Sequence, residues 1–417
     1  MKHPKAYVQP FVDKYNEAKT YYRDNNLSYK DIPALLIKFI RPIDAILIFL
    51  FVLTVIWFIP KSQRGLQQFE CFGPGLSPFE MDPNTYSEWH KGLPSPVIFY
   101  TEDESSDLIN VNKSITEISL DDAKSTADAI KNNERVLILT PLKDAALYLP
   151  RYFQLISALS YPHDLIDLAF LISDTTDETL GVLAVELERI QTGNMPFNRV
   201  NVFSKDFGYA LDNLDVEQRH AFAAQAPRRR AMAKARNYLL TAALKPEHSW
   251  VLWRDVDIVD SPKTIIEDLI NHDTDIIVPN IWFHRYDEEG KDIEGRFDYN
   301  SWVDTSQSVA LINTLDRETI IVEGYKEYDT GRDYMCRLGD WRRNKDEELE
   351  LDGIGGVNIV VKADVHRSGI NFPAYAFENQ CETEGFAKMA KRAGFRVVGL
   401  PNYVVWHIDT DEKAGNN

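Results

Sequence analysis

The sequence has few cysteines, and this scarcity limits how the protein can be stabilised. Only three occur in 417 residues, Cys71, Cys336 and Cys381, so at most one intrachain disulfide can form and one thiol is left over. There is no C-x-x-C pair and no Cys/His cluster with the spacing of a zinc site. A chain of this length can instead bury a sizeable hydrophobic core, in one large domain or two small ones.

Positive charge is also scarce, and it is unevenly distributed. The formal net charge is −18, yet residues 1–64 carry ten Lys or Arg against five Asp or Glu, which leaves −23 for the remainder. Nucleic-acid partners usually select a basic face, so we expect no nucleic-acid partner. An anionic substrate would need a metal ion or local arginines to be held.

Long apolar runs are limited to one segment, residues 45–59, which carries no charge. With its neighbours it approaches the lower limit of about 17 residues for a membrane-spanning helix. Some forty residues precede it and no A-x-A-like cleavage site follows, which favours an uncleaved signal anchor over a signal peptide. A buried core helix is the alternative. We predict a cytosolic tail at 1–42, a transmembrane anchor at 43–60, a Pro-rich stem at 61–133 and one domain at 134–417.

The flanking charges predict the orientation of this anchor. Lys and Arg are more numerous before the span than after it, which places the N-terminus in the cytosol and the large domain in the lumen, as in a type II membrane protein. The short span suits a thin, early-secretory membrane. Asn112 begins an Asn-Lys-Ser sequon on the predicted lumenal side, so we expect it to be glycosylated.

From residue 135 onward, predicted strands alternate with predicted helices. Strands are expected at 136–140, 167–172, 199–203, 250–253 and 275–279, and helices at 145–159, 178–190, 216–244 (interrupted at Pro227) and 263–271. Near the C-terminus we expect a helix at 382–392 and strands at 395–400 and 403–407. Such alternation indicates βαβ units and a mostly parallel central sheet, so the predicted fold class is α/β.

Two carboxylates follow the apolar strand at 250–253. Asp255 and Asp257 are separated by one residue, so in an extended chain they project from the same face. Oxygen ligands of this kind suit Mg²⁺ or Mn²⁺, which is usually held by one or two carboxylates and the phosphates of a substrate. The pattern predicts a nucleotide-diphosphate site, and the alternative is an acidic turn that merely closes a buried strand.

Several further residues are candidates for the same site. Asp174 ends the second predicted strand and either accepts hydrogen bonds from a base or ribose or caps a helix. Arg236 suits phosphate oxygens, whereas the triplet 228–230 is expected on a solvated basic face. His407 either completes a Mn²⁺ site or is a satisfied core histidine.

Two acids and a glycine cluster complete the set of candidates. Glu382 and Glu384 open a predicted helix, where they either orient an acceptor hydroxyl or stabilise the positive end of the helix dipole. The glycines at 353–356 either let the backbone approach a sugar closely or turn the chain.

Five blocks in this order resemble the fungal mannan-polymerase α-1,6-mannosyltransferases, glycosyltransferase family 62, also called the Anp family. They are ARNYLL (235–240), WRDVDI (253–258), VVKADVH (360–366), ETEGFAKMAK (382–391) and GLPNY (399–403). The resemblance implies a GT-A-like fold, Mn²⁺ (or Mg²⁺) as cofactor, and GDP-mannose as donor. It also implies α-1,6 transfer onto N-linked mannan of the cell wall, within a heteromeric Golgi complex of mannosyltransferase subunits.

The resemblance also implies roles for individual residues. Asp257 would bind the metal, Asp255 the metal or the ribose, and His407 would be the third metal-site residue. Asp174 and Arg236 would bind the nucleotide. Because donor and product are both α-linked, transfer would proceed with retention, and we favour front-face attack over a covalent intermediate. A non-catalytic scaffold subunit and a metal-dependent phosphodiester hydrolase are the alternatives.

Overall fold

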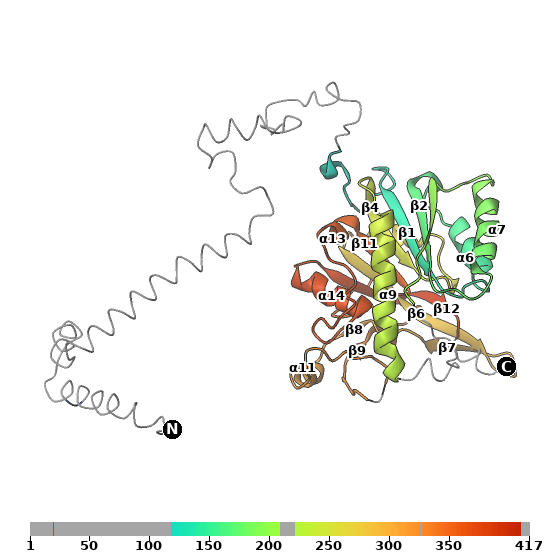
Figure 1. Ribbon diagram of the computed structural model, residues 1–417. Helices are drawn as coiled ribbons and strands as arrows, with labels where there is room; N and C mark the ends of the chain where they lie inside the picture. Colours follow the sequence, from blue (N-terminus) through green and yellow to red (C-terminus); the bar gives the residue numbers. More distant parts are fainter. Residues whose placement is uncertain (1–19, 21–117, 209–221, 326, 410–417) are drawn as a thin grey trace, which may run out of the picture. The chain divides into compact units, whose positions relative to one another are not determined.

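The computed structural model describes residue 20 and residues 118–208, 222–325 and 327–409 (Figure 1). Every element given below belongs to the compact unit that begins at residue 108. The predicted tail, the membrane anchor, most of the stem, Cys71 and Asn112 lie outside the described residues. Within the described ranges no helix is both long enough and apolar enough to cross a membrane.

A ten-stranded mixed sheet forms the centre of the domain. Its main path is β10-β12-β6-β11-β4-β1-β2-β3, with β5 paired to β12 and β7 to β6. The strands are β1 (Arg135–Leu142), β2 (Ile166–Ile172), β3 (Arg199–Ser204), β4 (His248–Arg254), β5 (Ile258–Asp260), β6 (Ile276–Tyr286), β7 (Asp292–Arg296), β10 (Leu349–Glu350), β11 (Asn358–Lys362) and β12 (Val397–His407). Strands β1 to β4 run parallel, as do β6 and β12, and β11 is antiparallel to both of its neighbours. The predicted α/β class with a mostly parallel sheet is confirmed.

Helices cover both faces of this sheet. They are α6 (Leu149–Ser157), α7 (Thr179–Gln191), α9 (Phe222–Ala243), α10 (Ile265–Ile270), α11 (Ser306–Ile312), α12 (Met335–Leu338), α13 (Ala363–Arg367) and α14 (Glu382–Arg392), with short 3₁₀ turns η2 (Leu120–Asp122) and η3 (His163–Leu165). A small second sheet pairs β8 (Trp302–Val303) with β9 (Asp333–Tyr334). In Figure 1, α9 crosses one face of the sheet. Helices α6 and α7, at the right of the view, lie on the opposite face of the sheet.

Strand β4 shows how the sequence builds this layered core. Its side chains alternate between the two faces, so Trp250 packs in the cluster with α6, α7 and α10, and Trp253 in the cluster with α9, α13 and α14. Both tryptophans are fully buried. A strand buried on both faces reads as a continuous apolar run, which is the pattern seen in the sequence.

Two details of the predicted elements were wrong. Pro227 lies inside α9 and does not interrupt it, and the later part of that helix, from Ala233 to Ala243, packs in the core. The two C-terminal strands form a single strand, β12, with a register irregularity between Leu400 and Val404. There the side-chain amide of Asn280 donates to the carbonyl oxygen of Pro401 at 2.7 Å, so the irregular backbone still has a partner.

Residues 118–133, the described part of the predicted stem, pack against the domain. Ala129 belongs to the hydrophobic core, and the hydroxyl of Ser125 donates to the carbonyl oxygen of Ser249 at 2.6 Å. The two cysteines within the described residues, Cys336 and Cys381, are buried and free, so they do not form a disulfide with each other.

Candidate functional site

The two predicted carboxylates lie in a tight turn at the carboxyl end of β4. The backbone N–H of Asp255 donates to the carbonyl oxygen of Val357 at 2.9 Å, which holds the start of the turn against β11. Strand β5 begins directly after Asp257 and pairs with the end of β12. Both side chains remain about 28–29 % exposed, so they are accessible to a ligand.

His407 lies against the second of these carboxylates. Its Nε2 is 3.0 Å from Oδ1 of Asp257, and its Nδ1 is 2.8 Å from the carbonyl oxygen of Ile408. The ring of Phe297 stacks on the imidazole with centroids 3.8 Å apart. A carbonyl oxygen can only accept, so Nδ1 carries a proton, and Nε2 faces the carboxylate with either a second proton or a lone pair. Burial lowers the pKa of His407, but the Asp257 carboxylate outweighs it and the net shift is upward.

The chemistry of this pair fits a divalent cation that is completed by a ligand. Among the residues that the structure describes, no group of three or more His, Cys, Asp or Glu is arranged to hold a metal by itself. Mg²⁺ and Mn²⁺ sites, however, often take one or two protein ligands and the phosphates of a substrate. Metal-binding histidines typically donate their other ring N–H to a carbonyl, as His407 does. Asp257 and His407 therefore form the protein part of a candidate cation site.

Arg236 on α9 contacts the other carboxylate. Its Nη2 is 3.3 Å from Oδ1 of Asp255, and its Nε donates to Oε1 of Glu382 at 2.8 Å. Arg236 is only 1 % exposed, and its guanidinium carbon lies 5.4 Å from the ring centroid of Trp253 and 5.5 Å from that of Phe372. Burial raises the pKa of Asp255 to about 6, although the nearby guanidinium opposes that shift. Arg236 thus reaches the site through Asp255 and not from an exposed position.

A second arginine of α9 is also buried, which corrects the prediction of a fully solvated basic triplet. Arg228 and Arg230 are exposed, but Arg229 turns inward and forms an ion pair with Glu384. Its Nη2 also donates to the side-chain oxygen of Asn300 at 2.8 Å. Burial raises the pKa of Glu384 to about 8, since its carboxylate is wholly shielded from water. In a helix, residues seven apart share a face, so Arg229 and Arg236 both face α14.

The structure therefore places Glu382 and Glu384 inside the protein, each against an arginine. Glu382 is 4 % exposed and Glu384 is fully buried, so neither presents an oxygen to solvent. A favourable interaction with the helix dipole does not account for these two acids by itself, because the guanidinium groups of α9 also contact their carboxylates. An acceptor role for these two acids remains a prediction.

Asp174 lies at the same carboxyl edge of the sheet, with β1 between its strand and β4. Its two carboxylate oxygens accept the backbone N–H groups of Phe207 at 3.1 Å and Gly208 at 3.0 Å. It does not cap the following helix, whose N-cap residue is Glu178. No contact joins Asp174 to Asp255 or Asp257 among the described interactions, so it stands apart from the acid–histidine pair.

The sequence reasoning missed the loop that borders this pair. Asp298, the residue after Phe297, is buried and accepts hydrogen bonds from the backbone N–H of Asn300 at 2.9 Å and the hydroxyl of Ser301 at 2.8 Å. A Cβ on Gly355 would lie 2.0 Å from Oδ2 of Asp298. The glycine cluster was a usable signal, because it makes room for buried side chains and does not only turn the chain.

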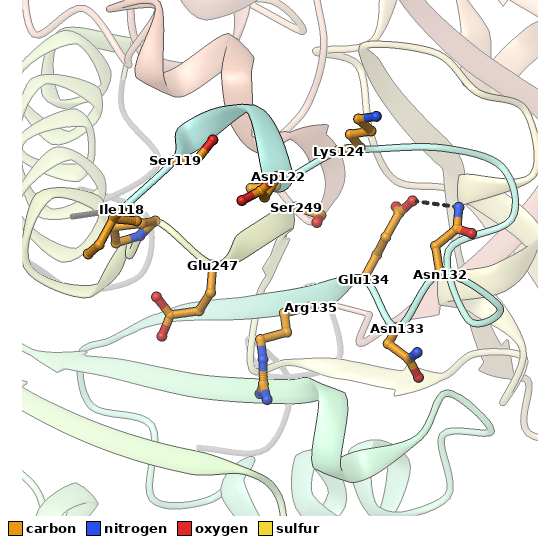
Figure 2. Close-up of a pocket in the computed structure, with 12 residues that line it drawn as sticks. Ile118, Ser119, Asp122, Lys124, Asn132, Asn133, Glu134, Arg135, Glu247 and Ser249 are labelled. Carbon is orange, nitrogen blue, oxygen red and sulfur yellow. Dashed lines mark hydrogen bonds between the residues drawn. The ribbon is translucent and has the colours of Figure 1, made fainter. Parts of the chain in front are cut away.

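A cavity of about 880 Å³ lies at the opposite edge of the sheet (Figure 2). Its walls come from the amino ends of β1 and β4 and the segment before β1, including Lys124, Glu134, Arg135, Glu247 and Ser249. Figure 2 shows Glu134 accepting a hydrogen bond from Asn132, at 3.3 Å. None of the predicted site residues lines it, so the cavity is separate from the candidate site.

The mixed sheet and the charged residues at the carboxyl ends of its strands define an α/β domain with a candidate ligand site at one edge of the sheet. Within that class, the chain belongs to the Anp1 family, whose model matches residues 114–376.

Three relatives show how closely the sequence matches. The chain is 51 % identical over 289 residues to the mannan polymerase II complex anp1 subunit of Schizosaccharomyces pombe, covering 69 % of this chain and 66 % of that protein. It is 45 % identical over 284 residues to the mannan polymerase II complex ANP1 subunit of Saccharomyces cerevisiae, covering 67 % and 56 %. It is 35 % identical to the mannan polymerase I complex VAN1 subunit of the same yeast, covering 79 % and 72 %. The chain thus spans less than two thirds of the length of the first two.

Two solved structures are similar at a low level. Mannosyltransferase PcManGT from Pyrobaculum calidifontis, in complex with GDP-Man and Mn²⁺, is 12 % identical with a TM-score of 0.35, covering 66 % of this chain and 56 % of that one. GalNAc-T7 with UDP, GalNAc and Mn²⁺ is 12 % identical with a TM-score of 0.36, covering 66 % and 44 %. Similarity at this level carries no argument about the chemistry of the site.

Proposed function

We propose that this protein is a metal-dependent, retaining mannosyltransferase. It moves mannose from GDP-mannose onto N-linked mannan in α-1,6 linkage, as a subunit of a mannan polymerase complex in the Golgi membrane. The observation that carries the proposal is the Asp257–His407 pair beside Asp255, at the carboxyl end of β4, in a chain of the Anp1 family. The three relatives described above are mannan polymerase complex subunits, which supports membership of such a complex.

Each residue of the site has a definite task in this proposal. Asp257 and His407 would hold Mn²⁺ or Mg²⁺, with the diphosphate supplying the remaining oxygens. The ion would act as a Lewis acid that stabilises charge on the leaving diphosphate. Asp255 would contact the ion or the ribose, and Asp174 and Arg236 would support the nucleotide, Arg236 through Asp255. Asp174 serves first as an acceptor for the backbone at Phe207 and Gly208.

Retention is best explained by front-face attack. Mannose C1 leaves the phosphate oxygen and bonds to the acceptor hydroxyl on the same face, and the hydroxyl proton passes to the leaving phosphate. A covalent intermediate would need a carboxylate that reaches C1. Glu382 and Glu384, the nearby acids on α14, are buried in ion pairs with arginines, which supports the front-face route. Any contribution of these two acids to an acceptor site would therefore be indirect, through the arginines that they contact. Mass-spectrometric trapping of a mannosyl-carboxylate adduct would contradict this mechanism.

The test is a transfer assay with the full chain. GDP-[¹⁴C]mannose and a defined mannoside acceptor are incubated with the wild type, Asp257→Ala and Asp260→Ala, and the product linkage is analysed. Asp260 is a matched control, because it lies three residues further along and its side chain is 65 % exposed. We expect an α-1,6 product from the wild type and the control, and at least a hundredfold less from Asp257→Ala, in line with losses seen when transition-state charge stabilisation is removed.

The same assay separates the two alternatives. A folded wild-type protein that neither transfers mannose nor consumes GDP-mannose would indicate a non-catalytic scaffold subunit. Consumption of donor at the same rate with and without acceptor, and with no transfer product, would indicate a phosphodiester hydrolase.

A further inference from the structure

The backbone of Glu382 has an unusual conformation. Its φ is +56°, in the left-handed region that residues with a Cβ rarely adopt, at the first position of α14. The conformation is held by a hydrogen bond from its N–H to the carbonyl oxygen of Pro373 at 2.9 Å. Strained residues of this kind tend to persist where a side chain must be aimed at a functional group.

The side chain of Glu382 is aimed at Arg236. Its Oε1 accepts from Nε of Arg236 at 2.8 Å, while Nη2 of the same guanidinium is 3.3 Å from Oδ1 of Asp255 and 3.2 Å from the carbonyl oxygen of Gly356. The rings of Trp253 and Phe372 lie 5.4 and 5.5 Å from the guanidinium carbon. Glu382 and the two rings therefore hold the guanidinium of Arg236 in one orientation. Asp255 contacts the guanidinium in that orientation.

Gly356 is required for this arrangement. A Cβ at that position would lie 2.6 Å from Nη2 of Arg236 and 3.2 Å from Cγ2 of Thr383. Any side chain there must push the guanidinium away from Asp255. Because Gly356 has no side chain, the same guanidinium can contact both Glu382 and Asp255.

We propose that Glu382 is a positioning residue, which sets the place of Asp255 through Arg236 before metal and nucleotide bind. This inference rests on the proposed function. Glu382 itself is 4 % exposed, so it acts without touching substrate. A carboxylate that is already held in its binding position loses less conformational entropy when the metal binds. Removing a residue that orients a metal ligand commonly weakens metal affinity about tenfold or more.

The experiment measures Mn²⁺ affinity of the full chain in the presence of GDP, by the electron paramagnetic resonance signal of free Mn²⁺. The variants are Glu382→Ala, which removes the anchor, Glu382→Gln, which keeps an acceptor oxygen for Arg236, and Gly356→Ala. Gly399→Ala is the matched control, since its Cβ would lie 2.3 Å from the sulfur of Met335, in contact with residues remote from Arg236. Thermal unfolding without metal is recorded for each protein, together with kcat and KM for GDP-mannose.

We expect Glu382→Ala and Gly356→Ala to weaken Mn²⁺ binding about tenfold or more and to raise KM, with Glu382→Gln recovering most of the affinity. Gly399→Ala lowers the melting temperature but keeps wild-type Mn²⁺ affinity. The double variant Glu382→Ala/Gly356→Ala should be no weaker than the worse single variant, because both act on one guanidinium.

Two results would overturn the inference, and they differ. If wild type binds Mn²⁺ with GDP, Asp257→Ala does not, and the folded Glu382 and Gly356 variants bind as wild type does, the positioning role alone is wrong. If wild type and Asp257→Ala both fail to bind Mn²⁺ with GDP, the proposed metal dependence fails and the positioning role fails with it.

Discussion

His407 and Asp257 are brought to 3.0 Å by the antiparallel pairing of β5 with the end of β12, in which His407 lies opposite Ile258. The acid comes from the middle of the chain and the histidine from its C-terminal part. Their approach depends on the sheet being fully assembled, so the site can form only in the folded domain.

Replacing His407 tests its place in the site. His407→Gln keeps a polar side chain but removes the imidazole nitrogen that faces Asp257, so we expect Mn²⁺ affinity in the presence of GDP to fall about tenfold or more. His272→Gln is the control, because His272 also forms a pair with an acid, Glu348 at 2.7 Å, and precedes the amino end of β6, whereas His407 pairs near its other end. Equal Mn²⁺ affinities in the two variants, measured by titration, would remove His407 from the metal site.

The buried carboxyl group of Glu384, which contacts Arg229, predicts a pH-dependent stability. Burial raises the pKa of Glu384 to about 8, so the folded state keeps a proton that the unfolded state releases above about pH 4.3. The stability that this proton contributes is present at low pH and is lost as the pH rises towards 8, by up to about 1.4 kcal/mol per pH unit. Relative to Glu384→Gln, the wild type should therefore become less stable between pH 5 and 8.

Denaturant unfolding of both proteins across that range measures the difference. Glu378→Gln is the control, since Glu378 forms a surface ion pair with Arg392 and should show no such trend. A wild type that gains stability over Glu384→Gln as the pH rises would mean that Glu384 is charged in the fold and that the sign is wrong.

The sequence predicted the framework of the site because that framework depends on local patterns. The apolar run before Asp255 and the alternation of strands and helices are set by burial and periodicity, which can be read without coordinates. The orientation of Arg229 could not be predicted, because three consecutive arginines look alike until helix α9 is placed on α14. The strained Glu382 and the loop at Phe297 also depend on distant packing, which no local pattern records.

The two described cysteines should be inert in the native protein. Cys336 and Cys381 are free and at most 1 % exposed, and burial raises the pKa of both thiols to about 12. Alkylating agents react with the thiolate, which is scarce at ordinary pH for such groups. We expect iodoacetamide at about pH 8 to leave both unlabelled in native protein and to label both in guanidinium chloride. Peptide mass mapping that found either one modified under native conditions would contradict the described packing.

Asp167 should stabilise the fold through its charge while leaving the site unaffected, because it lies at the amino end of β2, away from the carboxyl edge. Burial alone would raise its pKa, but hydrogen bonds from His248 and Asn198 and the charge of Arg199 hold it at about 2. The Nδ1 atom of His248 accepts the backbone N–H of Lys245, so its Nε2 carries the proton that it donates to Asp167.

Because the pKa is lowered on folding, the stability that Asp167 contributes is present above about pH 4 and is lost as the pH falls towards 2. Asp167→Asn should therefore lower the free energy of unfolding by about 2–3 kcal/mol at neutral pH, with a difference that shrinks below about pH 4. Asp128→Asn, at an exposed pair with Lys131, is the control and should stay within about 0.5 kcal/mol of wild type. Denaturant unfolding at several pH values measures both, and a deficit of Asp167→Asn that does not change with pH would show that its cause is packing and not charge.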